Sequence, residues 1–350
     1  MRILVTGHKG YIGAVLVPML LKQGYDVTGI DSDLYARCTF GREAPSVREI
    51  CKDIRDLELA DLDGYDAVIH LAALSNDPLG NLNPDLTYAI NYRASVKLAE
   101  LAKQAGVTRY LFASSCSTYG AAGDAILTEE AAFNPVTPYG HSKVLVERDV
   151  SALADDNFSP TFLRNATAYG VSPRHRFDIV LNNLTAWAYT TGLVYLKSDG
   201  SPWRPIVHIE DISRAFIAVL NAPRELVHNE AFNVGVNEEN YRIRELAEIV
   251  RETVPNCRVE YAEGAEPDKR TYRVDFSKIA ATLPDFKPQW NARRGAQQLY
   301  DAYRCVGVTL EEFEGPKYKR IDHIKQLIGD GVLDADLRWR VNATSLVGQS

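Results

Sequence analysis

The stretch Arg2-Ile3-Leu4-Val5-Thr6-Gly7-His8-Lys9-Gly10-Tyr11-Ile12-Gly13 opens with an apolar run and ends with three glycines at intervals of three. The apolar run predicts a buried strand, and residues 14–23 have the apolar periodicity of a helix. Glycines permit a tight turn and a close approach of the backbone to a ligand, while the helix N-terminus offers unpaired N–H groups to a diphosphate. The stretch therefore predicts a strand-turn-helix unit that binds a dinucleotide.

A second predicted strand, residues 25–30, ends at Asp31. A carboxylate at this point would accept hydrogen bonds from both hydroxyls of an adenosine ribose, and its charge would repel a 2′-phosphate. The sequence therefore favours NAD over NADP. Asp53 and Ile54 follow a short third strand, where they could hold the adenine ring.

Two further predicted strands lead to small or polar residues. Strand 67–71 is followed by Ala72-Ala73, whose short side chains would let a dinucleotide lie against the sheet. Helix 86–106 carries Asn91 on its first turns, and strand 109–113 is followed by Ser114-Ser115. In an open α/β sheet, ligands bind at the carboxyl ends of the strands, so these residues are expected at a binding site.

A helix is predicted to begin at Pro138, in the stretch Thr137-Pro138-Tyr139-Gly140-His141-Ser142-Lys143. Tyr139 and Lys143 would stand one helical turn apart on the same face. A free tyrosine has a pKa near ~10 and is a poor base at neutral pH. A neighbouring ammonium, together with a cationic nicotinamide, would favour the phenolate. Alone, this spacing also suits a plain surface pair, so its meaning depends on the rest of the chain.

The regular alternation of strands and helices ends near residue 170. Predicted helices 179–191, 211–220 and 243–254 are separated by shorter strands and a polar loop at 173–178. We therefore expect an α/β protein with a doubly wound parallel (Rossmann) sheet and a smaller C-terminal substrate-binding lobe. Residues 1–170 would form the NAD-binding domain, with later segments returning to it. Residues 171–340 would form mainly the substrate-binding lobe and the C-terminal helices.

Composition excludes several classes of protein. The 350 residues are 46% hydrophobic and 24% charged, and the formal charge of −7 without a basic run argues against a nucleic-acid partner. The five cysteines are scattered and the histidines lack metal-ligand spacing, so we expect a reducing compartment, no disulfides and no metal. No signal peptide or membrane-spanning run is recognised, and a cytoplasmic location away from membranes is the expectation.

Taken together, these pieces resemble the extended short-chain dehydrogenase/reductases, and within them the NAD-dependent nucleotide-sugar epimerase/dehydratase family. The resemblance covers residues 2–283. It rests on an ordered set of motifs: Gly7-x-x-Gly10-x-x-Gly13, Asp31, Asp53-Ile54, His70-Leu71-Ala72-Ala73, Ser114-Ser115 before Tyr119-Gly120, Tyr139-Gly140-His141-Ser142-Lys143, and Arg204 before His208-Ile209-Glu210-Asp211.

The resemblance implies roles for individual residues. Tyr139 would be the catalytic base, Lys143 would lower the pKa of Tyr139 and bind the nicotinamide ribose, and Ser115 would bind the reacting hydroxyl. The implied NAD contacts are Gly7, Gly10, Tyr11, Ile12, Gly13, Asp31, Asp53, Ile54, Leu71, Ala72, Ala73, Asn91, Ser114, Tyr139 and Lys143. The implied contacts to a nucleotide-sugar substrate are Ser75, Ser115, Thr167, Asn183, Arg204 and Arg270. Family members pair the helices that correspond to residues 86–106 and 139–154, which implies a homodimer.

One departure from the family pattern narrows the expected reaction. Dehydratases place an Asp-Glu pair after the catalytic hydroxyl residue and decarboxylases place a glutamate there, but this chain has Cys116 and Ser117. Neither residue can protonate a leaving hydroxyl and remove a neighbouring C–H proton. Epimerisation at C4 of a nucleotide sugar, through a 4-keto intermediate, is therefore favoured. A 4-keto oxidoreductase, a decarboxylase or dehydratase, and a non-catalytic NAD-binding protein stay open as alternatives.

Overall fold

The computed structural model describes residues 1–43, 45–75, 83–121, 123, 125–196, 198–262 and 271–340. The strands are β1 (Arg2–Thr6), β2 (Asp26–Asp31), β3 (Arg48–Cys51), β4 (Ala67–His70), β5 (Arg109–Ser115), β6 (Ile126–Leu127), β7 (Ser159–Asn165), β8 (Thr167–Tyr169), β9 (Leu193–Leu196), β10 (Trp203–His208), β11 (Glu230–Val234), β12 (Asn240–Arg242), β13 (Arg258–Tyr261) and β14 (Arg273–Val274).

The helices alternate with these strands through the first half of the chain and dominate the second half. They are α1 (Gly13–Lys22), α3 (Pro84–Thr87), α4 (Ala94–Gln104), α5 (Pro138–Ser151), α6 (Val180–Thr191), α7 (Ile209–Asn221), α8 (Arg224–Val227), α9 (Ile243–Thr253), α10 (Ser277–Thr282), α11 (Ala292–Val306), α12 (Leu310–Glu314) and α13 (Arg320–Gly329). A π-helical segment, Tyr88–Arg93, joins α3 to α4. No helix among the described residues is long and apolar enough to cross a membrane.

Within the described residues the central sheet has seven parallel strands in the order β11-β7-β5-β4-β1-β2-β3. The order reverses beside β1, because β2 lies on one side of it and β4 on the other. A crevice forms at such a reversal, at the carboxyl ends of the strands, and it is the usual ligand position in doubly wound folds. The predicted fold class is therefore confirmed, and β11 shows that a late segment returns to the sheet.

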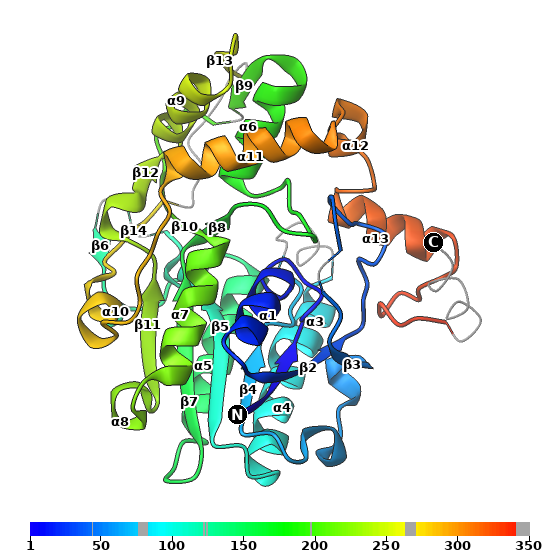
Figure 1. Ribbon diagram of the computed structural model, residues 1–350, viewed down its shortest axis with the longest axis vertical. Helices are drawn as coiled ribbons and strands as arrows, with labels where there is room; N and C mark the ends of the chain where they lie inside the picture. Colours follow the sequence, from blue (N-terminus) through cyan, green and yellow to red (C-terminus); the bar gives the residue numbers. More distant parts are fainter. Residues whose placement is uncertain are drawn as a thin grey trace.

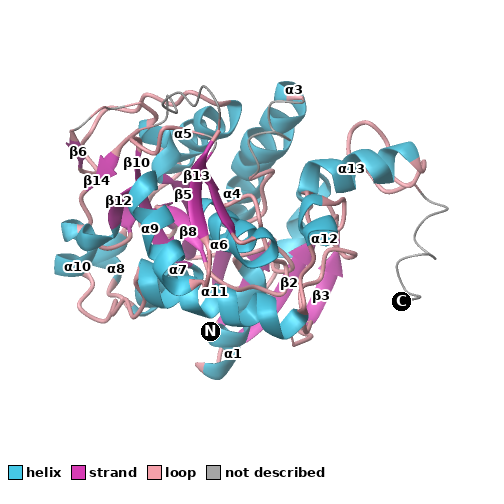
Figure 2. Ribbon diagram, turned by 90° about the horizontal axis from the view of Figure 1, so that it is seen from above, coloured by secondary structure: helices cyan, strands magenta, loops and turns pink. Residues whose placement is uncertain are grey.

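Side chains that alternate along the strands build a separate core on each face of the sheet. From β1, Ile3 and Val5 pack with α1 and α7, whereas Leu4 packs with α4 and α5 on the opposite face. Strands buried on both faces are typical of parallel sheets covered by helices. The third core lies between α6, α9, α11 and β9, and these elements form the lobe above the sheet in Figure 1. Figure 2 shows the same layers from above.

Helix α13 lies apart from this lobe. Its Ile324 and Leu327 join the core on the α4 and α5 face of the sheet, and the chain after it returns toward the loop that follows β2. In Figure 1 this helix lies beside the β2 and β3 edge of the sheet. The C-terminal segment (residues 316–340) therefore closes one end of the crevice above β1.

Candidate active site

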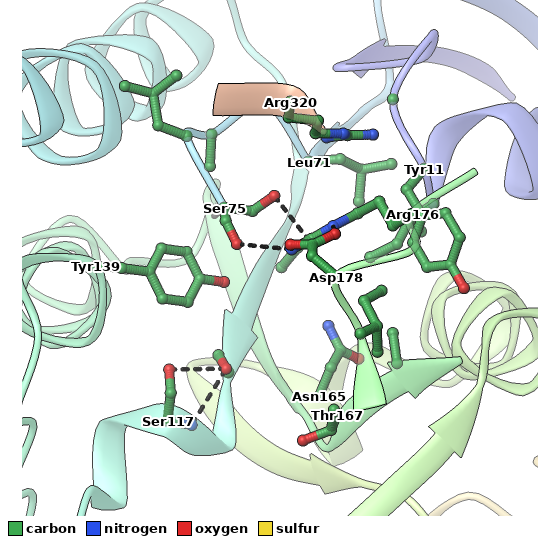
Figure 3. A pocket seen from close by; sticks show the side chains of 18 of the residues that line it. Tyr11, Leu71, Ser75, Ser117, Tyr139, Asn165, Thr167, Arg176, Asp178 and Arg320 are labelled. Carbon is green, nitrogen blue, oxygen red and sulfur yellow. Dashed lines mark hydrogen bonds and ion pairs between the residues drawn. The ribbon is translucent and has the colours of Figure 1, made fainter. Parts of the chain in front are cut away.

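A cavity of about 1030 Å³ lies at the carboxyl ends of the central strands, between the sheet and the lobe. Figure 3 shows side chains that line it, among them Tyr139 of α5, Asn165 of β7, Thr167 of β8 and Arg320 of α13, with others from the loops around them. The predicted site residues that line it are Gly7, Gly10, Tyr11, Ile12, Gly13, Asp31, Asp53, Ile54, Leu71, Ala72, Ala73, Ser75, Ser114, Ser115, Tyr139, Lys143, Thr167, Asn183 and Arg204. The structure thus brings together residues that are up to two hundred positions apart.

The glycine-rich turn has no room for side chains. Gly7 has a φ of +73°, and a Cβ there would lie 2.7 Å from the backbone nitrogen of Ala72. A Cβ on Gly13 would lie 2.3 Å from the carbonyl oxygen of Gly7. The turn therefore packs directly on the end of β4 and leaves the first N–H groups of α1 beside the cavity. This is the arrangement that a dinucleotide diphosphate requires.

Asp31 ends β2 on the cavity wall. Its carboxylate accepts hydrogen bonds from the N–H groups of Lys9, at 3.0 Å, and Asp33, at 2.8 Å. Burial raises the pKa of this carboxyl, and the two N–H groups oppose that shift. The ammonium of Lys9 is held 2.9 Å from carboxylate oxygens of both Asp33 and Glu49. The donor and acceptor set at this end of the cavity therefore suits the ribose hydroxyls of NAD.

Tyr139 and Lys143 are positioned by a well-defined helix start. The Thr137 hydroxyl accepts the N–H of Gly140 at 3.1 Å, and Pro138 fills the first turn of α5, where no N–H is needed. Lys143 Nζ donates to the carbonyl oxygen of Ala113 at 2.7 Å and lies 5.5 Å from the centre of the Tyr139 ring. Burial lowers the pKa of Lys143 to about 7. The ammonium is therefore fixed between the end of β5 and the tyrosine.

Ser115 is the last residue of β5, and its oxygen is already an acceptor. It receives the N–H of Ser117 at 3.1 Å and the Ser117 hydroxyl at 2.9 Å, as the dashed lines in Figure 3 show. With both lone pairs used, the Ser115 hydroxyl has its own hydrogen left to donate. It can therefore stabilise an oxygen that gains negative charge in the cavity.

The side chains of Ser114 and Cys116, on either side of Ser115, have hydrogen-bond partners in the protein interior. The Ser114 hydroxyl donates to the Glu147 carboxylate, which forms a buried ion pair with Arg164 at 2.7 Å. Cys116 is fully buried in the core, its thiol donates to the Arg164 carbonyl oxygen at 3.1 Å, and burial raises its pKa. Cys116 is therefore a packing residue.

One predicted NAD contact, Asn91, has a different position. Asn91 does not line the cavity; its buried amide accepts the N–H of Leu74 at 2.7 Å and donates to the Leu74 carbonyl oxygen at 3.0 Å. It therefore shapes the loop that carries Ser75. Asn91 lies in the π-helical segment Tyr88–Arg93 rather than in the regular α-helix that was expected there. Arg270 and the loop residues after Ser75 lie outside the described residues.

The cavity wall also includes charged residues that sequence reasoning missed. Arg176 donates to the Ser75 hydroxyl at 3.1 Å and pairs with Asp178 at 2.7 Å, and both line the cavity. Arg320, the first residue of α13, lines it as well. The sequence indicated only a polar loop at residues 173–178.

The tryptophans and His208 have structural roles. Trp290 stacks on His208 with 3.9 Å between ring centres, and Trp203 lies between the guanidinium groups of Arg242 and Arg273. The His208 ring also accepts the N–H of Glu210 at the start of α7. These contacts make Trp203, Trp290 and His208 packing residues.

Comparison with known proteins places this geometry in a family. Residues 3–235 match the model of the NAD dependent epimerase/dehydratase family. The UDP-glucose 4-epimerase of Lactobacillus helveticus is 30% identical over 315 residues, which cover 83% of this chain and 92% of that protein. The UDP-glucose 4-epimerase of Corynebacterium glutamicum is 29% identical over 269 residues, which cover 72% and 80%.

Solved structures agree with this placement. MoeE5 in complex with UDP-glucuronic acid and NAD superposes with a TM-score of 0.76 at 28% identity, and the match covers 87% of this chain and 99% of that chain. The dTDP-glucose 4,6-dehydratase DesIV of Streptomyces venezuelae has a TM-score of 0.74 at 24% identity, with 91% and 100% covered, and supports the fold alone.

This chain belongs to the NAD-dependent epimerase/dehydratase family. Its cofactor is NAD, as the glycine-rich turn and Asp31 predicted.

Proposed function

We propose that this protein inverts the configuration at C4 of a nucleotide-activated sugar through a transient 4-keto sugar. Its relatives include several UDP-glucose 4-epimerases, and the cavity holds Ser115, Tyr139 and Lys143 together. The nucleotide and the sugar are not assigned by these residues. The proposal concerns the reacting carbon and the way in which the cavity handles its proton.

The Tyr139 phenolate would accept the proton of the 4-hydroxyl group, and the Lys143 ammonium would stabilise that phenolate. Ser115 would donate its hydrogen to the same sugar oxygen as the C–O bond gains double-bond character. NAD supplies the acceptor and later the donor of the C4 hydride. Tyr139 would return the proton after the sugar has presented its other face, so neither protons nor electrons are consumed overall.

The observation that carries this proposal is the position of the carboxylates. Those among the described cavity residues are Asp31, Asp53 and Asp178. Asp31 accepts backbone N–H groups, Asp53 pairs with Arg55 at 2.7 Å, and Asp178 pairs with Arg176. After Ser115 come Cys116, whose thiol is buried in the core, and Ser117, whose hydroxyl donates to the Ser115 oxygen. Beyond the Tyr139 base, elimination of water needs an acid and a base beside the sugar, and the carboxylates among the described cavity residues are all engaged elsewhere.

The substrate would extend from Tyr139 toward the lobe. Asn183 and Arg204 line the cavity on that side, and the Arg204 guanidinium lies 5.6 Å from the centre of the Tyr272 ring. An arginine and an aromatic ring are suited to a diphosphate and a base or sugar face. Ser75 and Thr167 would contact the sugar, and Arg270 would provide a second contact to the diphosphate.

The reaction can be tested by incubating the holoenzyme with a panel of nucleotide sugars in D₂O and examining the products by NMR. Epimerisation at C4 predicts an inverted C4 without deuterium, because the same hydride returns. Loss of water, loss of carbon dioxide or deuterium at a ring carbon would contradict the proposal in favour of a dehydratase or decarboxylase. Net NADH formation would contradict it in favour of an oxidoreductase.

A further inference from the structure

Arg320 is a buried cation, and none of the described residues forms an ion pair with it. Its side chain lines the cavity, and Figure 3 shows it near Leu71, Arg176 and Tyr11. The residue is 7% exposed, its Nε has no hydrogen-bond partner, and one terminal nitrogen donates to the Arg174 carbonyl oxygen at 3.3 Å. Among the described residues, no carboxylate lies within ion-pair distance of Arg320.

The nearby Asp178 carboxylate favours the charged form of Arg320, but the carboxylates around Arg320 are paired with other arginines. Arg176 uses Asp178, and Arg174 uses Glu43 at 2.9 Å. The Arg320 guanidinium also lies over the Tyr35 ring, whose centre is 4.3 Å away. Burial lowers the pKa of Arg320. An isolated charge that has lost its water is strongly unfavourable, so the working form of the protein is expected to supply an anion here.

The position of Arg320 identifies the class of anion. Leu34 and Tyr35 follow Asp31 on the adenosine side of the cavity, and Leu71 follows β4 beside the glycine-rich turn. Arg320 contacts the Tyr35 ring and lies near Leu71 and Tyr11 of the glycine-rich turn in Figure 3. The N–H groups of such a turn and of the helix that follows it hold a dinucleotide diphosphate. We propose that Arg320 binds the diphosphate of NAD and that the C-terminal segment (residues 316–340) holds the adenosine half of the cofactor in place.

Further contacts tie this segment to the adenosine side. Arg338 lies 3.3 Å from Asp53 and 3.0 Å from Asp56, and Trp339 Nε1 donates to the Ser32 carbonyl oxygen at 2.6 Å. Leu337, which precedes Arg338, lines the cavity. A cofactor covered in this way can leave only after these contacts open, so release of NAD should be slow.

The test compares Arg320→Met with Lys325→Met, which removes an exposed charge from the same helix. Arg320→Met should weaken ADP binding about 10- to 100-fold, because a charge-assisted hydrogen bond to phosphate is lost, and it should leave adenosine binding unchanged. NAD should leave the holoenzyme faster by a similar factor on dilution into excess ADP-ribose. Lys325→Met should change none of these quantities, and Arg320→Lys should recover part of the ADP affinity.

Thermal melting of the NAD-free protein separates a binding role from a structural one. If Arg320 binds the diphosphate, NAD-free Arg320→Met protein should melt at the same temperature as the NAD-free wild type or higher, because an unpaired buried charge has been removed. A lower melting temperature together with unchanged ADP affinity and NAD release would make Arg320 a structural support for Tyr35 and would overturn the proposal. An equal loss of ADP and adenosine affinity would also overturn the assignment to the diphosphate.

Discussion

Lys143 Nζ is hydrogen-bonded to the Ala113 carbonyl oxygen at 2.7 Å while it lies 5.5 Å from the centre of the Tyr139 ring. One side chain thus joins the end of β5 to the first turn of α5, and Phe112 packs against it, with its ring centre 4.4 Å from Nζ. The charge beside Tyr139 is therefore held by the backbone rather than by a carboxylate, and it is free to favour the phenolate.

This burial predicts how stability depends on pH. The pKa of Lys143 is about 7 in the folded protein and near 10.5 when unfolded, so the unfolded chain binds the extra proton between these values. The free energy of unfolding should therefore rise from pH 7 to pH 10 because of Lys143, and this contribution should be flat below pH 7. Urea unfolding of NAD-free protein would measure this contribution. The gain in the free energy of unfolding of Lys143→Met over the wild type should be larger at pH 7 than at pH 9, and Lys325→Met, which changes an exposed lysine, is the control. An equal difference at pH 7 and pH 9 would contradict this account.

Asp31 should determine the choice of cofactor. Asp31→Ala should reduce NAD affinity about 10- to 100-fold, because a charged acceptor for the ribose hydroxyls is lost. The ratio of the NADP to the NAD dissociation constant should therefore become smaller than in the wild type. Calorimetric titration with both cofactors would measure the change. Asp26→Ala, at the exposed start of the same strand, is the control. Wild-type protein that prefers NADP would refute the role given to Asp31.

Ser115 should contribute less than the base. Ser115→Ala should lower turnover roughly 10²-fold, because one hydrogen bond to the reacting oxygen is lost while Tyr139 stays in place. Ser117→Ala removes a donor to the Ser115 oxygen and should have a smaller effect. Steady-state kinetics on the true substrate would rank the two variants. A larger loss in Ser117→Ala than in Ser115→Ala would reverse the assigned roles.

A homodimer through α4 and α5 stays a prediction. The two helices pack side by side, and Val96, Val144 and Leu145 are only half-buried on them. Light scattering at micromolar concentration should give twice the chain mass. Val144→Glu, which places a charge on the proposed interface, should lower the measured mass toward that of one chain. A wild-type monomer would contradict the prediction.

The sequence predicted the features that depend on local chemistry. The β1–α1 turn, Asp31 and the start of α5 are each defined by a short run of residues, and the structure has them at those places. Ser114 and Ser115, expected just after β5, are its last two residues. The sequence analysis did not predict helix α11. Its buried residues have the spacing of one helical face and could have indicated it: Ala292, Ala296, Leu299 and Tyr303.

Other parts of the site depend on contacts between distant segments, and the sequence alone could not reveal them. Arg320 lies far along the chain from Tyr35, yet its guanidinium contacts the Tyr35 ring. Arg176 resembles an ordinary loop arginine until it is seen beside Ser75. Asn91 was expected in a regular helix, but it lies in a π-helical segment and its amide is hydrogen-bonded to Leu74, far from it in the sequence.

The most direct test of the central claim, that Tyr139 is the base, is the turnover of Tyr139→Phe measured together with its NAD affinity. Removing only the proton acceptor should lower turnover on the true nucleotide sugar roughly 10²- to 10⁴-fold. NAD affinity should stay close to that of the wild type, because the ring and the neighbouring Lys143 remain. Near-normal turnover in Tyr139→Phe would contradict the proposed mechanism, and only the NAD-binding fold would stand.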